Sequence, residues 1–330
     1  MRRARLGATL GLWGALVMLP VGAPVGAEEA SAPPAWLAPY VGEGAGQIAA
    51  PVLARARALY LRKVAEGAAR NPCYFAMDAT RPNTEEDGAP GRRFYMICEA
   101  ARTFQAMPAG HGAGRRLEGL ADFANGRECA RHFGNAQDSE LTAGGAYVTA
   151  ETKASFKGYY LAAPGQDVPL LRAFVQFEGE GETANARQRA IGGHAAVTLK
   201  GLCRRPDRRS PYADADGYVI QGTLVDYTGG RSNGCTSWSP ADAAVIGATV
   251  KDAPTTLYIY PEAADIAAVA HAVAAGRPPS DAGTYWNAAC LRTIGSPVYW
   301  PQAALAPLIA QYRRDHPPPP PRPLPLCAAR

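Results

Sequence analysis

The segment Gly229-Gly230-Arg231-Ser232-Asn233-Gly234-Cys235-Thr236-Ser237-Trp238 lies between an alternating apolar run that ends at Val225 and a helical pattern over residues 239–246. This placement predicts that Cys235 lies at a turn from a strand to a helix. Such a turn points backbone N–H groups at one spot, where they stabilise a thiolate and, later, an oxyanion. Cys235 is therefore a candidate nucleophile; the alternative is that it forms one half of a disulfide in a glycine-rich loop.

The first 27 residues have the composition of a secretory signal peptide. Three arginines at positions 2, 3 and 5 precede an apolar run from Leu6 to about Val21, and small residues follow before Glu28. This order of charge, apolar run and small residues predicts cleavage after about Ala27 and export of the remaining chain. We expect a periplasmic protein.

The charge of the chain gives little reason to expect a nucleic-acid partner. Removal of residues 1–27 takes away three arginines and no acidic residue, which lowers the formal net charge from +5 to +2. The densest basic run, over residues 204–209, is short and broken by a proline, so it predicts a solvated loop or a contact with an anionic polymer. After residue 27 no apolar stretch reaches the ~20 residues of a membrane-spanning helix, so we expect no transmembrane segment in the mature chain.

Seven cysteines follow the predicted signal peptide: Cys73, Cys98, Cys129, Cys203, Cys235, Cys290 and Cys327. Cysteines of exported proteins tend to pair, and an odd number leaves at least one of them unpaired within the chain. The motif nominates Cys235 as the free cysteine. The other six can pair in fifteen ways, among which the sequence does not choose.

The chain divides by composition into five predicted segments. Residues 1–27 are the signal peptide, 28–91 a lead-in with an amphipathic helix over about 51–69, 92–260 the catalytic domain, 261–315 a helical extension, and 316–330 a proline-rich tail. Short alternating runs bounded by Gly, Pro and Asn predict a β core, either a sandwich or barrel-like. The candidate strands are residues 94–98, 103–107, 145–150, 173–177, 195–199, 218–225 and 255–260.

A nucleophilic thiol needs a base, and the chain has five histidines. His194 follows two glycines at the start of a candidate strand, which could place its ring beside a cleft. His271 lies in an alanine-rich helix and His316 beside the proline tail, so structural or exposed positions are expected for both. His111 and His132 lie in polar loops. We therefore predict His194 as the base; the alternative for a single histidine is a hydrogen-bonded core residue.

The order of these residues resembles the L,D-transpeptidase catalytic domain of the YkuD-like superfamily, and more closely its murein L,D-transpeptidase branch. The resemblance covers about residues 92–260. It is carried by His111-Gly112, Phe133-Gly134-Asn135, Tyr147-Val148-Thr149, Asn185-Ala186-Arg187-Gln188-Arg189-Ala190-Ile191 with His194, and Gly230-Arg231-Ser232-Asn233-Gly234-Cys235. The fold expected from it is mainly β (α+β), with an L,D-transpeptidase-like β-sandwich core flanked by N- and C-terminal helices.

The resemblance implies cross-linking of peptidoglycan stem peptides without a metal or cofactor. Cys235 would attack the donor stem, His194 would shuttle the proton, and an amine of a second stem would resolve the thioester in a three-to-three or one-to-three cross-link. Gly234, Cys235 and Asn233 would supply oxyanion donors. Ser232 would orient the loop or His194, while Arg231, His111 and Tyr147 would line the substrate cleft.

Two other classes remain open from the sequence. A secreted cysteine peptidase could use the same dyad with water as acceptor, although papain-like and NlpC-like peptidases have the cysteine before the histidine. Sortases have histidine first and an arginine shortly after the cysteine, whereas the next arginine here is Arg277. The third class is a non-catalytic wall-binding scaffold in which Cys235 is disulfide-bonded.

Overall fold

A computed structural model describes residues 33–328 of the chain. The predicted signal peptide at residues 1–27 lies outside the described residues. Within residues 33–328, no helix combines the length and the apolarity that crossing a bilayer requires.

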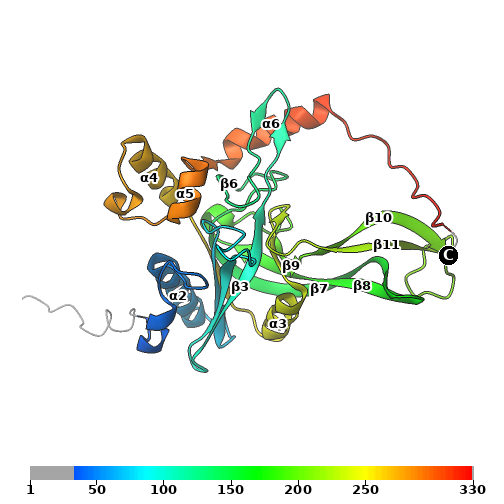
Figure 1. Cartoon of the computed structure of the whole chain (residues 1–330), viewed down its shortest axis with the longest axis horizontal. Coiled ribbons are helices and arrows are strands. Elements are labelled where there is room, and N and C mark those ends of the chain that lie inside the picture. Colours follow the sequence, from blue (N-terminus) through cyan, green and yellow to red (C-terminus); the bar gives the residue numbers. More distant parts are fainter. Residues whose placement is uncertain (1–32, 329–330) are drawn as a thin grey trace, which may run out of the picture. The chain divides into compact units, whose positions relative to one another are not determined.

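Eight strands, each paired with the next, form a single sheet whose first and last strands also pair, so that the sheet closes. In spatial order they are β7 (Gly145–Ala163), β14 (Thr256–Tyr260), β1 (Cys73–Asp78), β2 (Arg92–Cys98), β3 (Thr103–Gly112), β13 (Thr236–Trp238), β9 (Gly192–Ala195) and β8 (Gln166–Gly179), after which β8 pairs again with β7. The predicted β-sandwich is therefore wrong. Because β8 pairs with β9 on one edge and with β7 on the other, the strands form a closed barrel instead of two facing sheets (Figure 1).

The core follows from the alternation of side chains along these strands. Phe75 and Met77 of β1 belong to a buried cluster with residues of β2, β3, β8, β13 and β14. Tyr74 and Ala76 point to the opposite face, where they pack against the buried side of helix α2 (Ala50–Ala65). Since β1 is covered on both faces, it is buried along almost its whole length, and the barrel begins before residue 92.

An arm extends from the barrel. Strands β7 and β8 continue well beyond it as a two-stranded ribbon, and β11 (Tyr218–Asp226) and β10 (Val197–Pro206) add to the edge of β7, as Figure 1 shows. Short elements complete the barrel: β12 (Arg231–Ser232) pairs with β3, α3 (Pro240–Val250) follows β13, and η2 (Gly181–Thr183) follows β8. Two further elements, η1 (Ala35–Tyr40) and the β4–β5 hairpin (Arg116–Leu117 and Ala121–Asp122), lie nearer the N-terminus.

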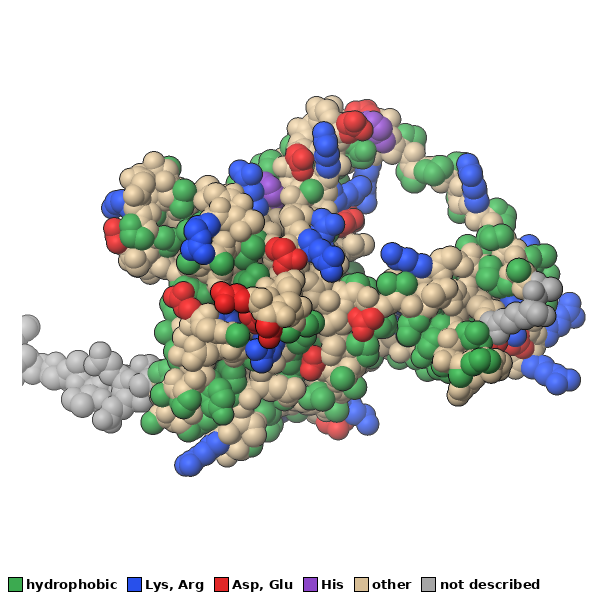
Figure 2. Space-filling model, viewed as in Figure 1, with side chains coloured by type: hydrophobic (Ala, Val, Ile, Leu, Met, Phe, Trp, Pro, Cys, Tyr) green, Lys and Arg blue, Asp and Glu red, His purple; other side chains and the backbone are tan. Residues whose placement is uncertain are grey.

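The C-terminal part is mainly helical and ends in an extended segment. It contains α4 (Ala263–Ala274), η3 (Pro279–Ala282), α5 (Ala288–Ile294), β15 (Val298–Trp300), which pairs with β6 (His132–Gly134), and α6 (Gln302–Asp315). The proline-rich segment then runs from α6 to the arm, where Cys327 is disulfide-bonded to Cys203 and its N–H donates to Arg204. Figure 2 shows that this segment stands clear of the rest of the chain for much of its length.

Three disulfides join six of the seven cysteines: Cys73–Cys98, Cys129–Cys290 and Cys203–Cys327. Cys235 is the free cysteine of the described residues, which confirms the prediction from the motif. Disulfides persist in oxidising compartments, so this set is consistent with an exported protein.

The Cys129–Cys290 disulfide should contribute most to stability. It links two buried cysteines that are 161 residues apart in sequence, and cross-links across long loops restrict the unfolded chain most. We expect the Cys129→Ala/Cys290→Ala protein to lose about 3–5 kcal/mol of unfolding free energy in urea titrations. The Cys203→Ala/Cys327→Ala protein is the control. Its disulfide closes a loop of similar length, 124 residues, but it holds an exposed tail that also gains freedom in the folded protein, so less of the entropy should appear as a loss of stability. An equal or larger loss in that control would contradict the expectation.

Candidate active site

The segment around Cys235 forms a turn between two short strands. Strand β12 pairs in parallel with β3, while β13 pairs with β3 on one side and with β9 on the other, in a register that sets Ser237 opposite His194. The turn, residues 233–235, therefore lies next to the strand that carries His194. The predicted strand-to-helix turn is wrong, because α3 begins only at Pro240, where Ser239 caps it by accepting a hydrogen bond from the N–H of Asp242.

Two glycines make this arrangement possible. Gly234 has φ of +98°, a left-handed conformation that side chains rarely adopt. Gly193 lies against the ring of Trp238, and a Cβ at this position would come within 1.9 Å of the ring. A glycine in β9 thus lets the indole pack across the strand beside His194.

Ser232 closes the turn from inside. Its side chain is buried and its hydroxyl donates to the carbonyl of Cys235 and, at 3.4 Å, to the carbonyl of His111. Of the two roles predicted for Ser232, its contacts fit the first: the hydroxyl bonds to backbone carbonyls of the loop and of β3, and not to His194.

His111 lies beneath the turn and does not line the cleft as predicted. Its ring is fully buried: Arg93 donates to Nδ1 at 3.1 Å, and Nε2–H donates to the carbonyl of Gly126 at 3.2 Å. Burial, together with the charge of Arg93, holds the pKa of His111 well below its ordinary value. The neutral ring connects β3 to a neighbouring loop, so its role is structural.

Tyr147 is also an interior residue and not part of the cleft. It is 1 % exposed, its hydroxyl donates to the carbonyl of Ala143 at 2.7 Å, and its ring lies 5.9 Å from that of Phe177. A strand that is buried on one side cannot show by its sequence alone which of its aromatic residues face a cleft.

The other predicted residues, except Gly234, meet in one pocket of about 500 Å³. We call it the Cys235 pocket; it is lined by Arg172, Phe174, Ala190, His194, Thr198, Tyr227, Arg231, Ser232, Asn233 and Cys235. Arg231 is exposed and donates to the carbonyl of Asn125 at 2.7 Å, which fixes the guanidinium at the rim. The structure thus brings together the predicted nucleophile, the predicted base and three residues of the cysteine motif, Arg231, Ser232 and Asn233.

The thiol of Cys235 is half-buried and points to the turn before β9. Sγ–H donates to the carbonyl of Ala190 at 3.6 Å, and no hydrogen bond joins it to His194 among residues 33–328. Burial raises the pKa of the Cys235 thiol above its ordinary value, while the N–H of Gly192 and the charges of Arg172 and Arg189 act in the opposite direction.

His194 has the tautomer that a base requires. Its Nδ1 lies 2.8 Å from the carbonyl of Ala195, which only accepts, so Nδ1 carries the proton and Nε2 has a free lone pair. The ring stacks on Phe174, and burial lowers the pKa of His194 below its ordinary value. A neutral thiol and a neutral imidazole therefore line the same pocket.

Thiol labelling tests this resting state. We expect iodoacetamide to modify one thiol per native chain, at Cys235, with a rate that rises about tenfold per pH unit to above pH 9, because only the thiolate reacts. The rate is measured by mass spectrometry of quenched samples. A plateau below pH 8 would show instead that the thiol is already ionised in the free protein.

Three arginines, Arg231, Arg172 and Arg189, supply positive charge near Cys235, and the sequence predicts only Arg231 for the site. Arg231 belongs to the cysteine motif, whereas Arg172 lies on an exposed strand without any signal. Arg189 lies in the quoted segment 185–191, but the pattern does not reveal that it lies near Cys235. Residues 33–328 contain no group of three or more His, Cys, Asp or Glu side chains placed to hold a metal ion.

Comparison with known proteins gives no match to this chain among family models, curated proteins or solved structures.

Proposed function

We propose that this chain is a periplasmic peptidoglycan L,D-transpeptidase that uses Cys235 as nucleophile and His194 as base. The observation that carries the proposal is that the free cysteine lines the same pocket as His194, whose Nε2 has an available lone pair. A thiol and an imidazole at one pocket are the minimum set for acyl transfer through a thioester.

The proposed reaction has two steps. Sγ of Cys235 transfers its proton to Nε2 of His194 and attacks the carbonyl of the diaminopimelate residue in a tetrapeptide stem. The C–N bond to D-alanine then breaks, and D-alanine leaves with the proton from His194. In the second step an amine of another stem attacks the thioester, the C–S bond breaks, and the proton of the amine returns to the thiolate through His194.

The turn that holds Cys235 has the donors that this chemistry needs. The backbone N–H groups of Asn233, Gly234 and Cys235 make no hydrogen bond to other residues within 33–328. Donors of this kind can stabilise a tetrahedral oxyanion, and loss of one typically costs about 3 kcal/mol of transition-state stabilisation. The positive charges of Arg172 and Arg231 at the same pocket favour stem peptides, which carry carboxylates.

An acyl-enzyme experiment tests the proposal. The mature chain is mixed with purified tetrapeptide muropeptides, quenched in acid, digested and analysed by mass spectrometry. We expect a thioester of the donor stem on Cys235, one equivalent of released D-alanine, and cross-linked dimers after longer incubation. Products with diaminopimelate as acceptor indicate three-to-three cross-links, and products with the amine of the first stem residue indicate one-to-three cross-links.

Other outcomes point to the remaining classes. A thioester that yields only hydrolysed tripeptide would identify a peptidase with the same dyad. Absence of a thioester from a folded protein with a reactive Cys235 would contradict the transpeptidase.

A further inference from the structure

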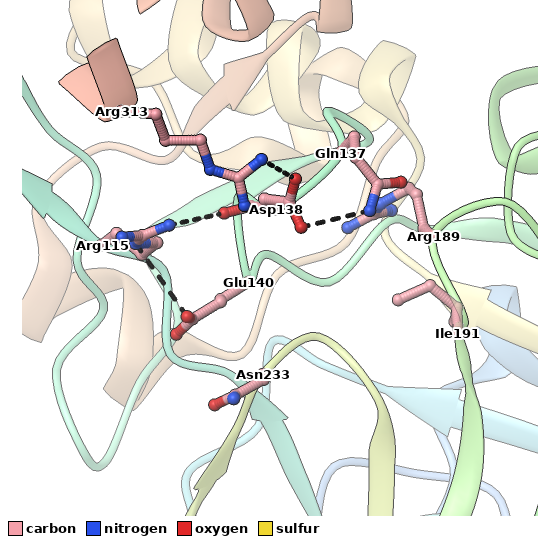
Figure 3. A pocket seen from close by; sticks show the side chains of 8 residues that line it. All are labelled: Arg115, Gln137, Asp138, Glu140, Arg189, Ile191, Asn233 and Arg313. Carbon is pink, nitrogen blue, oxygen red and sulfur yellow. Dashed lines mark hydrogen bonds and ion pairs between the residues drawn. The ribbon is translucent and has the colours of Figure 1, made fainter. Parts of the chain in front are cut away.

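A second, smaller cavity adjoins the Cys235 pocket. It has a volume of about 190 Å³, and Arg189, Ile191 and Asn233 are among the residues that line it (Figure 3). Asn233 lines both spaces. Ala190, which accepts the hydrogen bond from the thiol, lies between Arg189 and Ile191 in sequence. We call this space the Arg189 cavity; two of its lining residues, Arg189 and Ile191, are the sequence neighbours of the residue that contacts the nucleophile.

Arg189 brings a charge that the described part of the chain does not neutralise. Its side chain is 9 % exposed, Nη2 donates to the carbonyl of Leu141 at 2.8 Å, and Nε has no hydrogen-bond partner. Among residues 33–328 no carboxylate forms an ion pair with it. A buried charge without a counter-ion is costly, as the lowering of the Arg189 pKa by burial also indicates.

The other charges of the cavity are engaged with one another. Arg313 pairs with Asp138 at 2.6 Å, and Arg115 lies 3.9 Å from Glu140, as the dashed lines in Figure 3 mark. Gln137 donates to Asp138 at 3.2 Å, and its own Oε1 is buried without a partner. The cavity therefore has an excess of one positive charge, three arginines against two carboxylates, and one free acceptor, the complement of a carboxylate and an N–H group.

We propose that the Arg189 cavity binds the C-terminal residue of the donor peptide, with the terminal carboxylate on Arg189. The proposal rests on the acyl-transfer function above and names the group that selects its substrate. The volume of the Arg189 cavity is below the ~300–1,000 Å³ of pockets for drug-sized ligands, so the cavity suits one small residue. A guanidinium is the side chain best matched to a carboxylate, and the released residue is the part of the donor that carries one.

Single-turnover acylation tests the proposal without an acceptor. Two tetrapeptide donors are compared, one with a terminal carboxylate and one with a terminal carboxamide, and the thioester on Cys235 is followed by intact mass. We expect the carboxamide to react roughly 100-fold more slowly with the wild-type chain, because it leaves Arg189 without its counter-ion. Arg189→Gln should slow the carboxylate donor by a similar factor and leave the carboxamide unchanged.

Arg187→Gln is the matched control. Arg187 lies two residues away on the same turn, but it is exposed and paired with Glu151 and Glu178, so both donors should react as with the wild type. Equal rates for the two donors with the wild-type chain would overturn the proposal, as would an equal slowing of both donors by a folded Arg189→Gln protein. If that variant does not fold, the comparison of donors with the wild type still decides.

Binding to an inactive protein separates this inference from the function on which it rests. In the Cys235→Ala chain, D-alanine should shift the NMR signals of residues around Arg189, and D-alaninamide should not. No acylation by either donor would contradict the transpeptidase, whereas equal shifts by the two ligands would contradict the carboxylate site alone.

Discussion

Replacement of Cys235 by alanine should abolish cross-linking, with a loss of roughly 10⁶-fold, the scale seen when a covalent nucleophile is removed. The thioester cannot form without Sγ, and no other free thiol exists among residues 33–328 to replace it. Dimer formation from purified muropeptides, measured by liquid chromatography and mass spectrometry, is the readout.

The fold should survive this change. The thiol donates one long hydrogen bond to Ala190 and accepts from the N–H of Gly192, and the turn is closed by the hydroxyl of Ser232 on the carbonyl of residue 235, which remains. We therefore expect near-UV circular dichroism and the melting temperature of Cys235→Ala to match the wild type. Thr228→Ala is a suitable control: it lies in the preceding loop, between β11 and β12, outside the Cys235 pocket, and its hydroxyl bonds only to Asp226.

Cross-linked dimer at the wild-type level from Cys235→Ala would disprove the assignment of the nucleophile. If both Cys235→Ala and Thr228→Ala lose activity and unfold at lower temperature, the loss would reflect the stability of the loop instead of chemistry.

The sequence predicts best what depends on local patterning. The alternating run at residues 94–98 is part of β2, and the apolar face over 52–64 lies within α2, because both periods follow from neighbours along the chain. Likewise, the odd number of cysteines predicts an unpaired one, and the motif around Cys235 predicts which one it is. In contrast, β1 is covered on both faces, so its residues do not alternate between apolar and polar, and the pattern does not predict the strand.

The closure of the barrel could not be predicted in the same way. It depends on parallel pairing of β1 with β14 and of β9 with β13, and on β8 pairing at both edges. These contacts join residues far apart in sequence, and alternation within a strand is the same in a sandwich and in a barrel. The candidate site shows the same limit: His111 and Tyr147 have suitable chemistry, but only the three-dimensional arrangement shows that both are buried.

Replacement of His194 by alanine should slow acylation of Cys235 by about 10²–10⁴-fold near neutral pH, the usual contribution of a general base. The sign of the pH dependence follows from the two pKa shifts. The pKa of His194 is lowered, so the neutral, proton-accepting ring persists below pH 6.5, and the wild-type rate should fall only under more acidic conditions.

In His194→Ala the thiol has to ionise without help, and burial raises the pKa of Cys235. The rate of the variant should therefore increase with pH up to above pH 9, where the thiolate forms by itself, and the defect should shrink steadily over that range. His271→Ala, on the exposed face of α4, should retain the wild-type profile. A defect that is constant from pH 6 to pH 10 would assign His194 to binding or packing. Hydroxide can deprotonate the thiol in place of a missing base, but it cannot replace a binding or packing contact.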